Sequence, residues 1–580
     1  MTNRIPIALL FLVAALGNLA YWSLTARPQE AGPGINGPLK SVSFAPFRKG
    51  QSPLTQVYPP ASQIEEDIQL LKGLTRGLRT YTSQEGMENV PPLAAKHGFK
   101  VTHSAWLGTT KATNEKEVAA LIKAANQYPE VIERVIVGNE VLLRRDLQPE
   151  ELIAHIKKVK QSIKQPVSYA DVWAFYLKHP EVGHAVDFLT IHILPYWEDE
   201  PVGIEGVGAH IKKIHDQMKA AFPGKPILIG EAGWPTIGRQ RGPADPGVVN
   251  SAKHARQLVE VAEREGFDYN LVEAFDQYWK SKLEGTVGAR WGIVGDDRKP
   301  KFPLTGKVVE NPNWLLGFEL SLVLGIAGCL PFLGRLRRAS GNAAFAFVAL
   351  AQALAVFFVI TASSGFSRSY FLDSEIGSYI WTVLTALFAV LLLKSAADSL
   401  SLVGEGGCST GKALANVRNC RDSSHLRRGL ALFFLFCALL QTAAIVVDGR
   451  YRDIPVSTFL IPIFGLGLLG LTRFIADGGR EGLHGAFALG GRFAVPPAAA
   501  ELKFDRWLVW SCLVLSILNI LAEGRAIVGE DFSKTHPTLA EQAPLVLQAM
   551  FSSGSVLTWS VMLLLAALPF AANVAQARRG

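Results

Sequence analysis

The distribution of apolar and polar positions divides the 580-residue chain into two kinds of sequence. Between residues 40 and 311, charges are frequent and short apolar runs alternate with helical patterns, as in a water-soluble α/β domain. After residue 313, long apolar runs are separated by short charged loops, and another apolar run, residues 5–24, precedes the soluble part. A helix needs about 20 apolar residues to cross a bilayer. The pattern therefore predicts a soluble domain joined to a membrane-embedded one.

We predict an N-terminal transmembrane anchor at residues 1–27, a linker at 28–39, a soluble domain at 40–311 and a helical transmembrane domain of about seven spans at 312–580. A cleaved signal peptide is the alternative to the anchor. The segment from Trp22 to Ala26 matches a small-residue cleavage site poorly, which favours the anchor. Under either interpretation the soluble domain is exported.

The seven later spans are predicted at residues 314–333, 343–362, 378–393, 430–447, 456–471, 507–521 and 545–570. Arginine and lysine gather in alternate loops: Arg335, Arg337, Arg338, Lys412, Arg418, Arg421, Arg427, Arg428, Arg473, Arg480, Arg492, Lys503, Arg506, Arg578 and Arg579. Because positive residues collect on the cytoplasmic side, both termini are predicted inside and the soluble domain outside. This topology accounts for the net charge of +8 without a nucleic-acid partner.

All cysteines of the chain lie outside the soluble domain: Cys329, Cys408, Cys420, Cys437 and Cys512. The soluble domain therefore has neither a disulfide framework nor a thiolate zinc site. We expect free thiols, no metal site and no cofactor.

The soluble domain contains eight candidate strands, at residues 41–44, 77–81, 100–105, 135–137, 167–170, 188–191, 226–229 and 270–275. Helical patterns lie between them. Ser62 and Glu65 have the spacing of a capping box. Apolar stripes follow at Ile64, Ile68 and Leu71, and later at Leu152, Ile156, Val159 and Ile163. Eight strand–helix alternations predict an α/β fold of the (β/α)8 TIM-barrel type. An open doubly wound sheet is the alternative, but no glycine-rich loop follows the first strand.

Two glutamates stand where buried strands end. Val137-Gly138-Asn139-Glu140 closes the fourth predicted strand, and Ile229-Gly230-Glu231 closes the seventh. The carboxyl ends of barrel strands carry the chemistry of this fold, so both side chains are expected in one cleft. Two carboxylates about 5 Å apart can cleave a glycosidic bond with retention of configuration, one as proton donor and the other as nucleophile.

The motifs around these glutamates resemble those of glycoside hydrolase family 17, the β-1,3-glucanases and glucanosyltransferases. The resemblance rests on Gly138-Asn139-Glu140, Gly230-Glu231-Ala232-Gly233-Trp234-Pro235, Ile193-Leu194-Pro195-Tyr196-Trp197, Glu273-Ala274-Phe275-Asp276 and Trp291-Gly292. It implies that Glu140 is the acid/base, that Glu231 is the nucleophile and that the Tyr196 hydroxyl bonds the nucleophile. Many relatives have a glutamate where this chain has Gln277, which puts a charge pair between that position and Lys280 in doubt.

Further polar and aromatic residues near strand ends are candidates for binding sugar. The Asn139 amide is suited to a sugar 2-hydroxyl. The indoles of Trp173, Trp197, Trp234, Trp279 and Trp291 offer stacking faces, of which two or three are expected to face ligand. Residues at the ends of the second and fifth strands either bind sugar or brace the glutamates. The predicted substrate-binding set is Asn139, Tyr196, Trp234, Arg79, Tyr81, Asp171, Trp173, Lys280 and Trp291.

The sequence favours a β-1,3-glucanosyltransferase that acts on donor and acceptor glucan chains and forms branches or β-1,6 linkages. A hydrolase gains nothing from eight spans, whereas an enzyme that remodels glucan emerging from a membrane synthase gains proximity. The layout is similar to that of a bacterial inner-membrane protein implicated in cyclic β-(1,3),(1,6)-glucan synthesis, with the enzyme in the periplasm. The alternatives are an endo-β-1,3-glucanase and a non-catalytic glucan-binding subunit of a synthase.

Overall fold

In the computed structural model, the described residues are 6–402, 410–479, 482–488, 499–529 and 532–577. Cys408, Arg480, Arg492, Arg578 and Arg579 lie outside them. The chain divides into two compact units, one from Pro28 to Glu310 and the other made of Met1–Arg27 with Asn311–Gly580. Each unit is considered by itself below.

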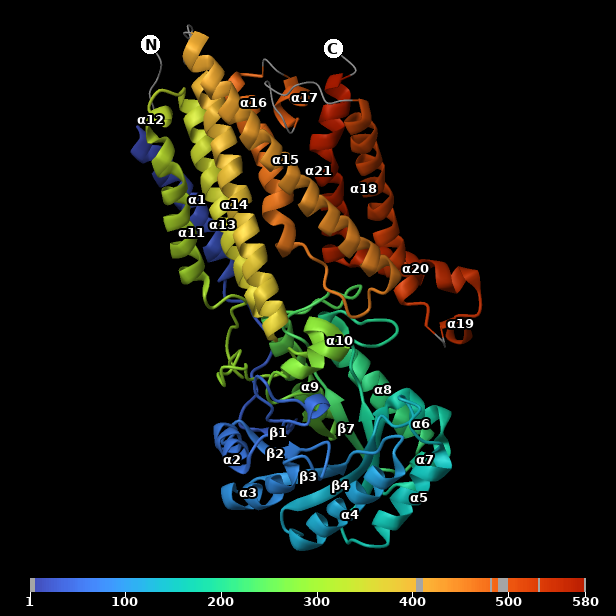
Figure 1. The fold of residues 1–580 in the computed structure, drawn as a ribbon. Helices are drawn as coiled ribbons and strands as arrows, with labels where there is room; N and C mark the ends of the chain where they lie inside the picture. Colours follow the sequence, from blue (N-terminus) through green and yellow to red (C-terminus); the bar gives the residue numbers. More distant parts are fainter. Residues whose placement is uncertain (1–5, 403–409, 480–481, 489–498, 530–531, 578–580) are drawn as a thin grey trace. The chain divides into compact units, whose positions relative to one another are not determined.

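The first unit is a closed barrel of eight parallel strands, counted over the described residues (Figure 1). The strands are β1 (Leu39–Ser43), β2 (Thr75–Arg79), β3 (Lys100–Ala105), β4 (Ile132–Asn139), β5 (Val167–Val172), β6 (Leu189–His192), β7 (Ile227–Ala232) and β8 (Asp268–Leu271). Each strand pairs with its neighbours in chain order, and β1 closes the ring on β8 through Val42 and Leu271. The predicted barrel is confirmed, and the open-sheet alternative is wrong.

The barrel forms because apolar side chains of its strands pack on both faces of the sheet, most completely in β4. Val135, Ile136 and Val137 of β4 are completely buried, one side toward the barrel interior and the other toward the surrounding helices. Those helices are α2 (Ala61–Leu70), α3 (Val90–His97), α4 (Lys111–Gln127), α5 (Pro149–Lys160), α6 (Trp173–Lys178), α7 (Pro180–Ala185), α8 (Val207–Ala221), α9 (Val248–Glu265) and α10 (Ser281–Gly288). The structure thereby brings the carboxyl ends of all strands to one face of the ring.

The predicted capping box at Ser62 is wrong. Helix α2 begins one residue earlier, at Ala61, with Pro60 at its N-cap and no side-chain cap. Glu65 instead pairs with Lys96 and His97 of α3. The apolar stripe of Ile64 and Ile68 is buried as predicted, because it faces the strands.

The second unit is a bundle of long helices. Its helices are α1 (Ile7–Thr25), α11 (Trp314–Cys329), α12 (Leu333–Leu336), α13 (Gly341–Ser367), α14 (Leu372–Leu402), α15 (Thr410–Val447), α16 (Leu466–Asp477), α17 (Gly482–Phe487), α18 (Ala499–Ala526), α19 (Phe532–Thr535), α20 (Leu539–Ser552) and α21 (Gly554–Ala577). Among the described residues, eight helical segments are long and apolar enough to cross a membrane. These segments indicate a membrane protein.

The last predicted span, residues 545–570, has different bounds in the structure. The chain breaks at Ser553, whose backbone is extended, so that residues 545–552 belong to α20 and the apolar segment runs from Gly554 to Ala575. The sequence shows no sign of this break except Ser552-Ser553-Gly554, because apolar residues continue on both sides of it.

Helix α1 packs within the bundle, although almost 300 residues separate it from α11 in the chain. The Trp22 indole donates a hydrogen bond of 3.0 Å to Ser321 Oγ, and Ser321 Oγ donates to Asn18 Oδ1. A Cβ at Gly317 would lie 2.5 Å from the Trp22 ring, so only glycine permits this contact. Such small-residue contacts and polar bonds are typical of packed membrane helices.

Candidate active site

Glu140 leaves the end of β4 in a turn that only particular residues can form. Gly138 has φ +85°, and a Cβ there would lie 2.8 Å from Val141 Cγ2. Glu140 itself has φ +50°, in the left-handed region that a side chain rarely adopts. Its backbone N–H donates to the Ala170 carbonyl in β5. The Glu140 side chain keeps 24% of its surface exposed.

Glu231 lies within β7, at its carboxyl end, and is more deeply buried, with 11% of its side chain exposed. The residue before it must be glycine, because a Cβ at Gly230 would lie 2.3 Å from Thr190 Cγ2 and 3.4 Å from Arg79 Nη1. The close approach of neighbouring strands thereby holds the Glu231 carboxylate against the Arg79 guanidinium.

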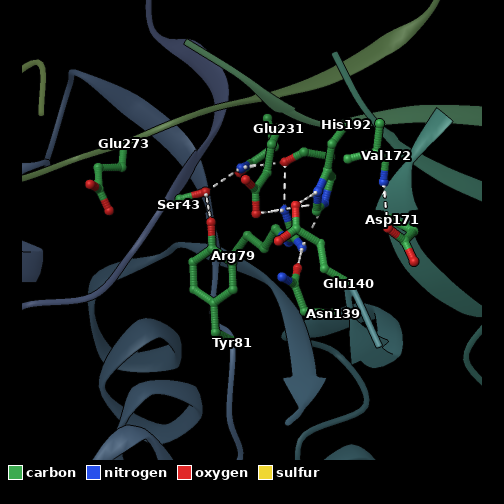
Figure 2. Close-up of polar contacts among 12 residues, drawn as sticks. Ser43, Arg79, Tyr81, Asn139, Glu140, Asp171, Val172, His192, Glu231 and Glu273 are labelled. Atoms are coloured by element: carbon green, nitrogen blue, oxygen red, sulfur yellow. Dashed lines mark hydrogen bonds and ion pairs between the residues drawn. The ribbon is translucent and has the colours of Figure 1, made fainter. Parts of the chain in front are cut away.

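The two carboxylates meet in the cleft with an imidazole between them (Figure 2). One oxygen of Glu140, one oxygen of Glu231 and a ring nitrogen of His192 lie within 4.8 Å of one another. His192 Nδ1 is 2.9 Å from Glu140 Oε1, and His192 Nε2 is 3.6 Å from Glu231 Oε1. This carboxylate separation corresponds to the geometry of a retaining glycosidase, in which the second carboxylate reaches the sugar carbon directly.

Arg79 connects the acid side of the cleft with the nucleophile side. Its side chain is completely buried, and Nη1 donates to the Gly230 carbonyl at 2.7 Å and to Glu231 Oε1 at 3.2 Å. Nη2 donates to Asn139 Oδ1 at 2.6 Å. The sequence left open whether Arg79 binds sugar or braces the glutamates. Because no part of it reaches the surface, Arg79 braces them, and we withdraw it from the sugar-binding set.

The surroundings of Glu231 favour its ionised form. Burial alone would raise the pKa of this carboxyl, but the positive charges of His192, Arg79 and Lys280 and the nearby Tyr81 hydroxyl hold it below its ordinary value. A low pKa keeps the group available as a nucleophile.

The Tyr81 hydroxyl, rather than that of Tyr196, is the phenol beside the nucleophile. Tyr81 also donates to Ser43 Oγ at 2.8 Å. Tyr196 is completely buried, and its hydroxyl donates to the Arg239 carbonyl at 2.5 Å. The role that the family resemblance gave to Tyr196 is therefore corrected. Tyr81 lies two residues after Arg79, the last residue of β2, and stays a candidate for the site.

Asp171 supports the turn that carries Glu140. This carboxylate is completely buried and accepts hydrogen bonds from Tyr169 Oη, from the Val172 N–H at 2.8 Å and from the Leu143 N–H at 3.4 Å. Burial and the nearby charge of Glu140 raise the pKa of Asp171 to about 7. The predicted sugar contact of Asp171 is wrong, because no sugar reaches a buried group that is already bonded to its own loop.

Lys280 finds its counter-ion within the same eighth-strand motif. Lys280 Nζ lies 3.0 and 2.9 Å from the two carboxylate oxygens of Glu273, which is fully buried. Burial raises the pKa of Glu273 to about 7 although Lys280 acts in the opposite direction. Gln277 is also buried and bonds the backbone at Ala45 and Phe275. Lys280 therefore forms its ion pair with Glu273 and not with position 277, where the glutamine bonds the backbone.

The Asn139 side chain is held by Arg79, and its predicted contact with a sugar 2-hydroxyl stays a prediction. Arg79 donates to its amide oxygen, which leaves the amide nitrogen free to donate. Within the described part of the chain that nitrogen has no hydrogen-bond partner, and it is not sealed from solvent. A sugar hydroxyl is a suitable acceptor for it.

The tryptophans near the strand ends differ in exposure. Trp234 and Trp291 are only 1% and 3% exposed, and both rings pack edge-on against Tyr196. Their predicted sugar-binding role is wrong, because the carboxyl-end loops fold over them. Trp173 is partly exposed and donates to Glu198 Oε1 at 3.2 Å, so it stays a candidate for sugar binding. Trp197 and Trp279 are also partly exposed.

Sequence reasoning missed His192, although its position offered a signal. It follows the sixth predicted strand directly and precedes the Ile193-Leu194-Pro195-Tyr196 motif, where a side chain points into the cleft. The set of Glu140, His192 and Glu231 also has the donor atoms and spacing to hold a metal ion. Each imidazole nitrogen faces one carboxylate, an arrangement that equally suits acid–base chemistry.

A closed parallel barrel with two glutamates meeting at the ends of β4 and β7 defines a glycoside-hydrolase type of site. Residues 41–292, which include both glutamates, match the BtgE/BtgC glycoside hydrolase domain. A glucan 1,3-beta-glucosidase of Arthroderma benhamiae is 30% identical over 271 residues, which cover 43% of this chain and 87% of that protein. The glucan 1,3-beta-glucosidase BGL2 of Candida albicans is 27% identical over 277 residues, covering 42% and 87%.

Among solved structures, the glycoside hydrolase family 17 β-1,3-glucanosyltransferase of Rhizomucor miehei matches with 26% identity and a TM-score of 0.40, covering 45% of this chain and 95% of that one. Through its barrel unit, the chain belongs to the BtgE/BtgC family of glycoside hydrolases.

Proposed function

We propose that the barrel cleaves β-1,3-glucan with retention of configuration, through a covalent glycosyl-enzyme intermediate. The supporting observation is the pair of carboxylates, whose oxygens lie within 4.8 Å of each other and of His192. The relatives named glucan 1,3-beta-glucosidase support the choice of glucan.

In the first step, a Glu231 oxygen attacks the anomeric carbon as the bond from that carbon to the leaving oxygen breaks. The leaving oxygen takes a proton from Glu140, which exchanges protons with His192 Nδ1 over 2.9 Å. In the second step, an incoming hydroxyl gives its proton to Glu140 and bonds the anomeric carbon, and Glu231 departs as a carboxylate. Asn139 donates to the 2-hydroxyl, and Tyr81 and Lys280 support the nucleophile.

We infer that the incoming hydroxyl belongs to a second glucan chain, so that the enzyme is a glucanosyltransferase that elongates or branches glucan. The membrane unit supports this choice, because an enzyme held at the bilayer meets glucan where a synthase would release it. Helix α1 is packed into the bundle through Trp22 and Ser321, which supports a retained anchor rather than a cleaved peptide. The loop charges favour an exported barrel at a bacterial inner membrane, facing the periplasm.

Hydrolysis is the second candidate, because the relatives from Arthroderma benhamiae and Candida albicans are named as glucosidases. The purified full chain, incubated with laminari-oligosaccharides, distinguishes the two by product analysis. Longer or β-1,6-linked products, identified by mass spectrometry and NMR, are the expected result. Exclusively shorter products would support the hydrolase. No turnover would contradict the catalytic proposal and leave a glucan-binding subunit of a synthase as the better description.

A further inference from the structure

Trp106 is an exposed indole on the catalytic face of the barrel that the mechanism above does not use. It follows Ala105, the last residue of β3, and Ala105 pairs in register with Val137 immediately before the Gly138-Asn139-Glu140 turn. Trp106 is 39% exposed, in contrast to the buried rings of Trp234 and Trp291. It is therefore placed beside the acid/base turn, with part of its ring open to solvent.

Arg144 holds this indole in place. Its guanidinium lies over the Trp106 ring, with the central carbon 4.2 Å from the ring centroid. Every nitrogen of the guanidinium is engaged: Nη1 donates to the Asn139 carbonyl, Nη2 to the Leu107 carbonyl at 2.8 Å, and Nε to Asp146 Oδ2 at 2.7 Å. A guanidinium bonded in this way is a fixed support rather than a mobile side chain.

The same contacts tie the indole to the acid/base residue. The Arg144 backbone N–H donates to the Glu140 carbonyl at 2.9 Å, and the Arg144 side chain bonds the residue just before Glu140. On the other side, the Trp106 backbone N–H donates to the buried Glu117 carboxylate at 3.1 Å. The open face of the ring is thus held in a constant position relative to Glu140.

The position on the Glu140 side determines which sugar the indole would meet. Glu231 lies under the anomeric carbon of the donor, whereas Glu140 protonates the leaving oxygen and later deprotonates the incoming hydroxyl. A surface anchored to the Glu140 turn therefore faces the leaving group and the acceptor. Pyranose rings present apolar C–H faces, and aromatic side chains in binding sites supply the apolar area that orients such ligands.

We propose that Trp106, backed by Arg144, is a binding surface for a sugar ring of the acceptor glucan and thereby favours transfer over hydrolysis. The inference rests on the proposed function, because it assigns a sugar to the acceptor side of the same cleft. An acceptor held on Trp106 competes with water for the glycosyl-enzyme, and the intermediate then passes to a hydroxyl of glucan.

The test uses the full chain with laminari-oligosaccharides over a range of concentrations. In Trp106→Ala we expect the transfer-to-hydrolysis ratio to fall about tenfold and the acceptor concentration for half-maximal transfer to rise by a similar factor, because water needs no binding surface to attack the glycosyl-enzyme. Trp106→Phe is expected to keep most of the transfer activity. Leu70→Ala, which removes an apolar side chain of similar exposure from α2, serves as the control and should leave the ratio unchanged.

A purely structural Trp106 gives a different result. If the ring only steadied Arg144 and Glu140, Trp106→Ala would slow transfer and hydrolysis equally, and an unchanged ratio overturns the inference. A wild-type protein that hydrolyses without transfer also overturns it. A wild-type protein without any turnover contradicts the proposed function itself, and circular dichroism of each variant separates misfolding from these outcomes.

Discussion

Glu231 and Glu140 occupy opposite edges of the cleft, and the protein surrounds them differently. At the β7 edge, Arg79 and Lys280 place positive charge against Glu231, which lies in a strand with 11% of its side chain exposed. At the β4 edge, Glu140 lies in a turn with 24% exposed, beside His192 and the turn-supporting Asp171. In Figure 2 the carboxylates of Asp171 and Glu273 lie to either side of this central group.

The difference follows the role that the proposed mechanism gives to each group. A nucleophile must stay ionised, so it is placed in a strand and surrounded by buried cations. An acid/base residue must gain and lose a proton in each cycle, so it stays closer to solvent and to groups that can themselves be neutral. Two identical side chains thereby acquire different roles from their surroundings.

The largest effect should come from exchanging the two glutamates for alanine. Glu231→Ala should lower turnover by about 10³-fold or more on every donor, because no covalent intermediate forms. Glu140→Ala should be equally severe on glucan but mild for the first step on an aryl glucoside whose leaving group needs no proton. The measurements are the rates of both variants with glucan and with the aryl glucoside. They are repeated with azide, which can replace the incoming hydroxyl in the second step because it needs no general base. Equal losses of rate for both variants on the aryl glucoside would contradict the assignment of Glu140 as acid/base and Glu231 as nucleophile.

Arg79→Met should lower kcat by about 10²-fold, because Glu231, Gly230 and Asn139 lose a shared donor. Without this cation the pKa of Glu231 rises, and the acidic limb of the pH–rate profile moves to higher pH. Breaking a buried ion pair also costs about 3–5 kcal/mol of stability, so thermal unfolding is followed in parallel. Arg79→Lys keeps the charge and should keep the limb near its wild-type position. If the acidic limb of the pH–rate profile does not move in Arg79→Met, Arg79 does not hold down the pKa of Glu231.

His192→Gln should reduce kcat about tenfold, a smaller effect than Arg79→Met because Arg79 still faces Glu231. The amide cannot carry a positive charge, so the acidic limb should again move upward. His192 contacts Glu140 and Glu231 with its two ring nitrogens, whereas a glutamine amide has one nitrogen to donate. The variant therefore also tests the contact between His192 and Glu140. The pH dependence of kcat with a natural oligosaccharide measures both effects. An unchanged profile would mean that His192 is merely a packing residue.

Asp171→Asn should have the smallest effect on rate and a specific effect on stability. The pKa of Asp171 is raised to about 7 in the fold, so the folded state holds a proton that the unfolded chain releases at lower pH. This stabilisation is complete below about pH 4 and is lost as pH rises through about 7. The variant cannot titrate, so its unfolding midpoint should fall less than that of the wild type between pH 4 and 7. Glu273→Gln is the control, because Glu273 titrates in the same range without supporting the Glu140 turn.

Strands and helices with a regular pattern of apolar residues were predictable from the sequence. Breaks and ends within such a pattern were not. The eight strands were visible from short apolar or β-branched runs, clearest at Val135–Val137, although β1, β2 and β3 each also contain an exposed charged residue. The apolar helices were visible because their runs exceed what a soluble domain needs. The boundary between α20 and α21 was not visible, because apolar residues continue through Ser553. The capping box at Ser62 failed because α2 begins at Ala61 with Pro60 at its N-cap, which places Ser62 inside the helix.

Within the site, the sequence indicated which residues stand at the cleft but not which of them reach it. Trp234 and Trp291 belong to the expected motifs, yet both rings are buried against Tyr196. His192 was missed because it stands alone between two apolar segments, where a histidine has no sequence partner. Glu273 was not recognised as the partner of Lys280, because that pairing depends on how the segment after β8 turns back on itself.

The sequence by itself determined the alternation of strands and helices, the apolar spans and the two strand-end glutamates, because each is encoded within a few consecutive residues. Only the tertiary structure decided that Arg79 links Asn139 with Glu231, that His192 stands between the glutamates and that Tyr81 rather than Tyr196 adjoins the nucleophile. The physical reason is that hydrogen bonds and charge interactions act over a few ångströms, and closure of the barrel brings together side chains that are separated by 60 to 152 positions in the chain.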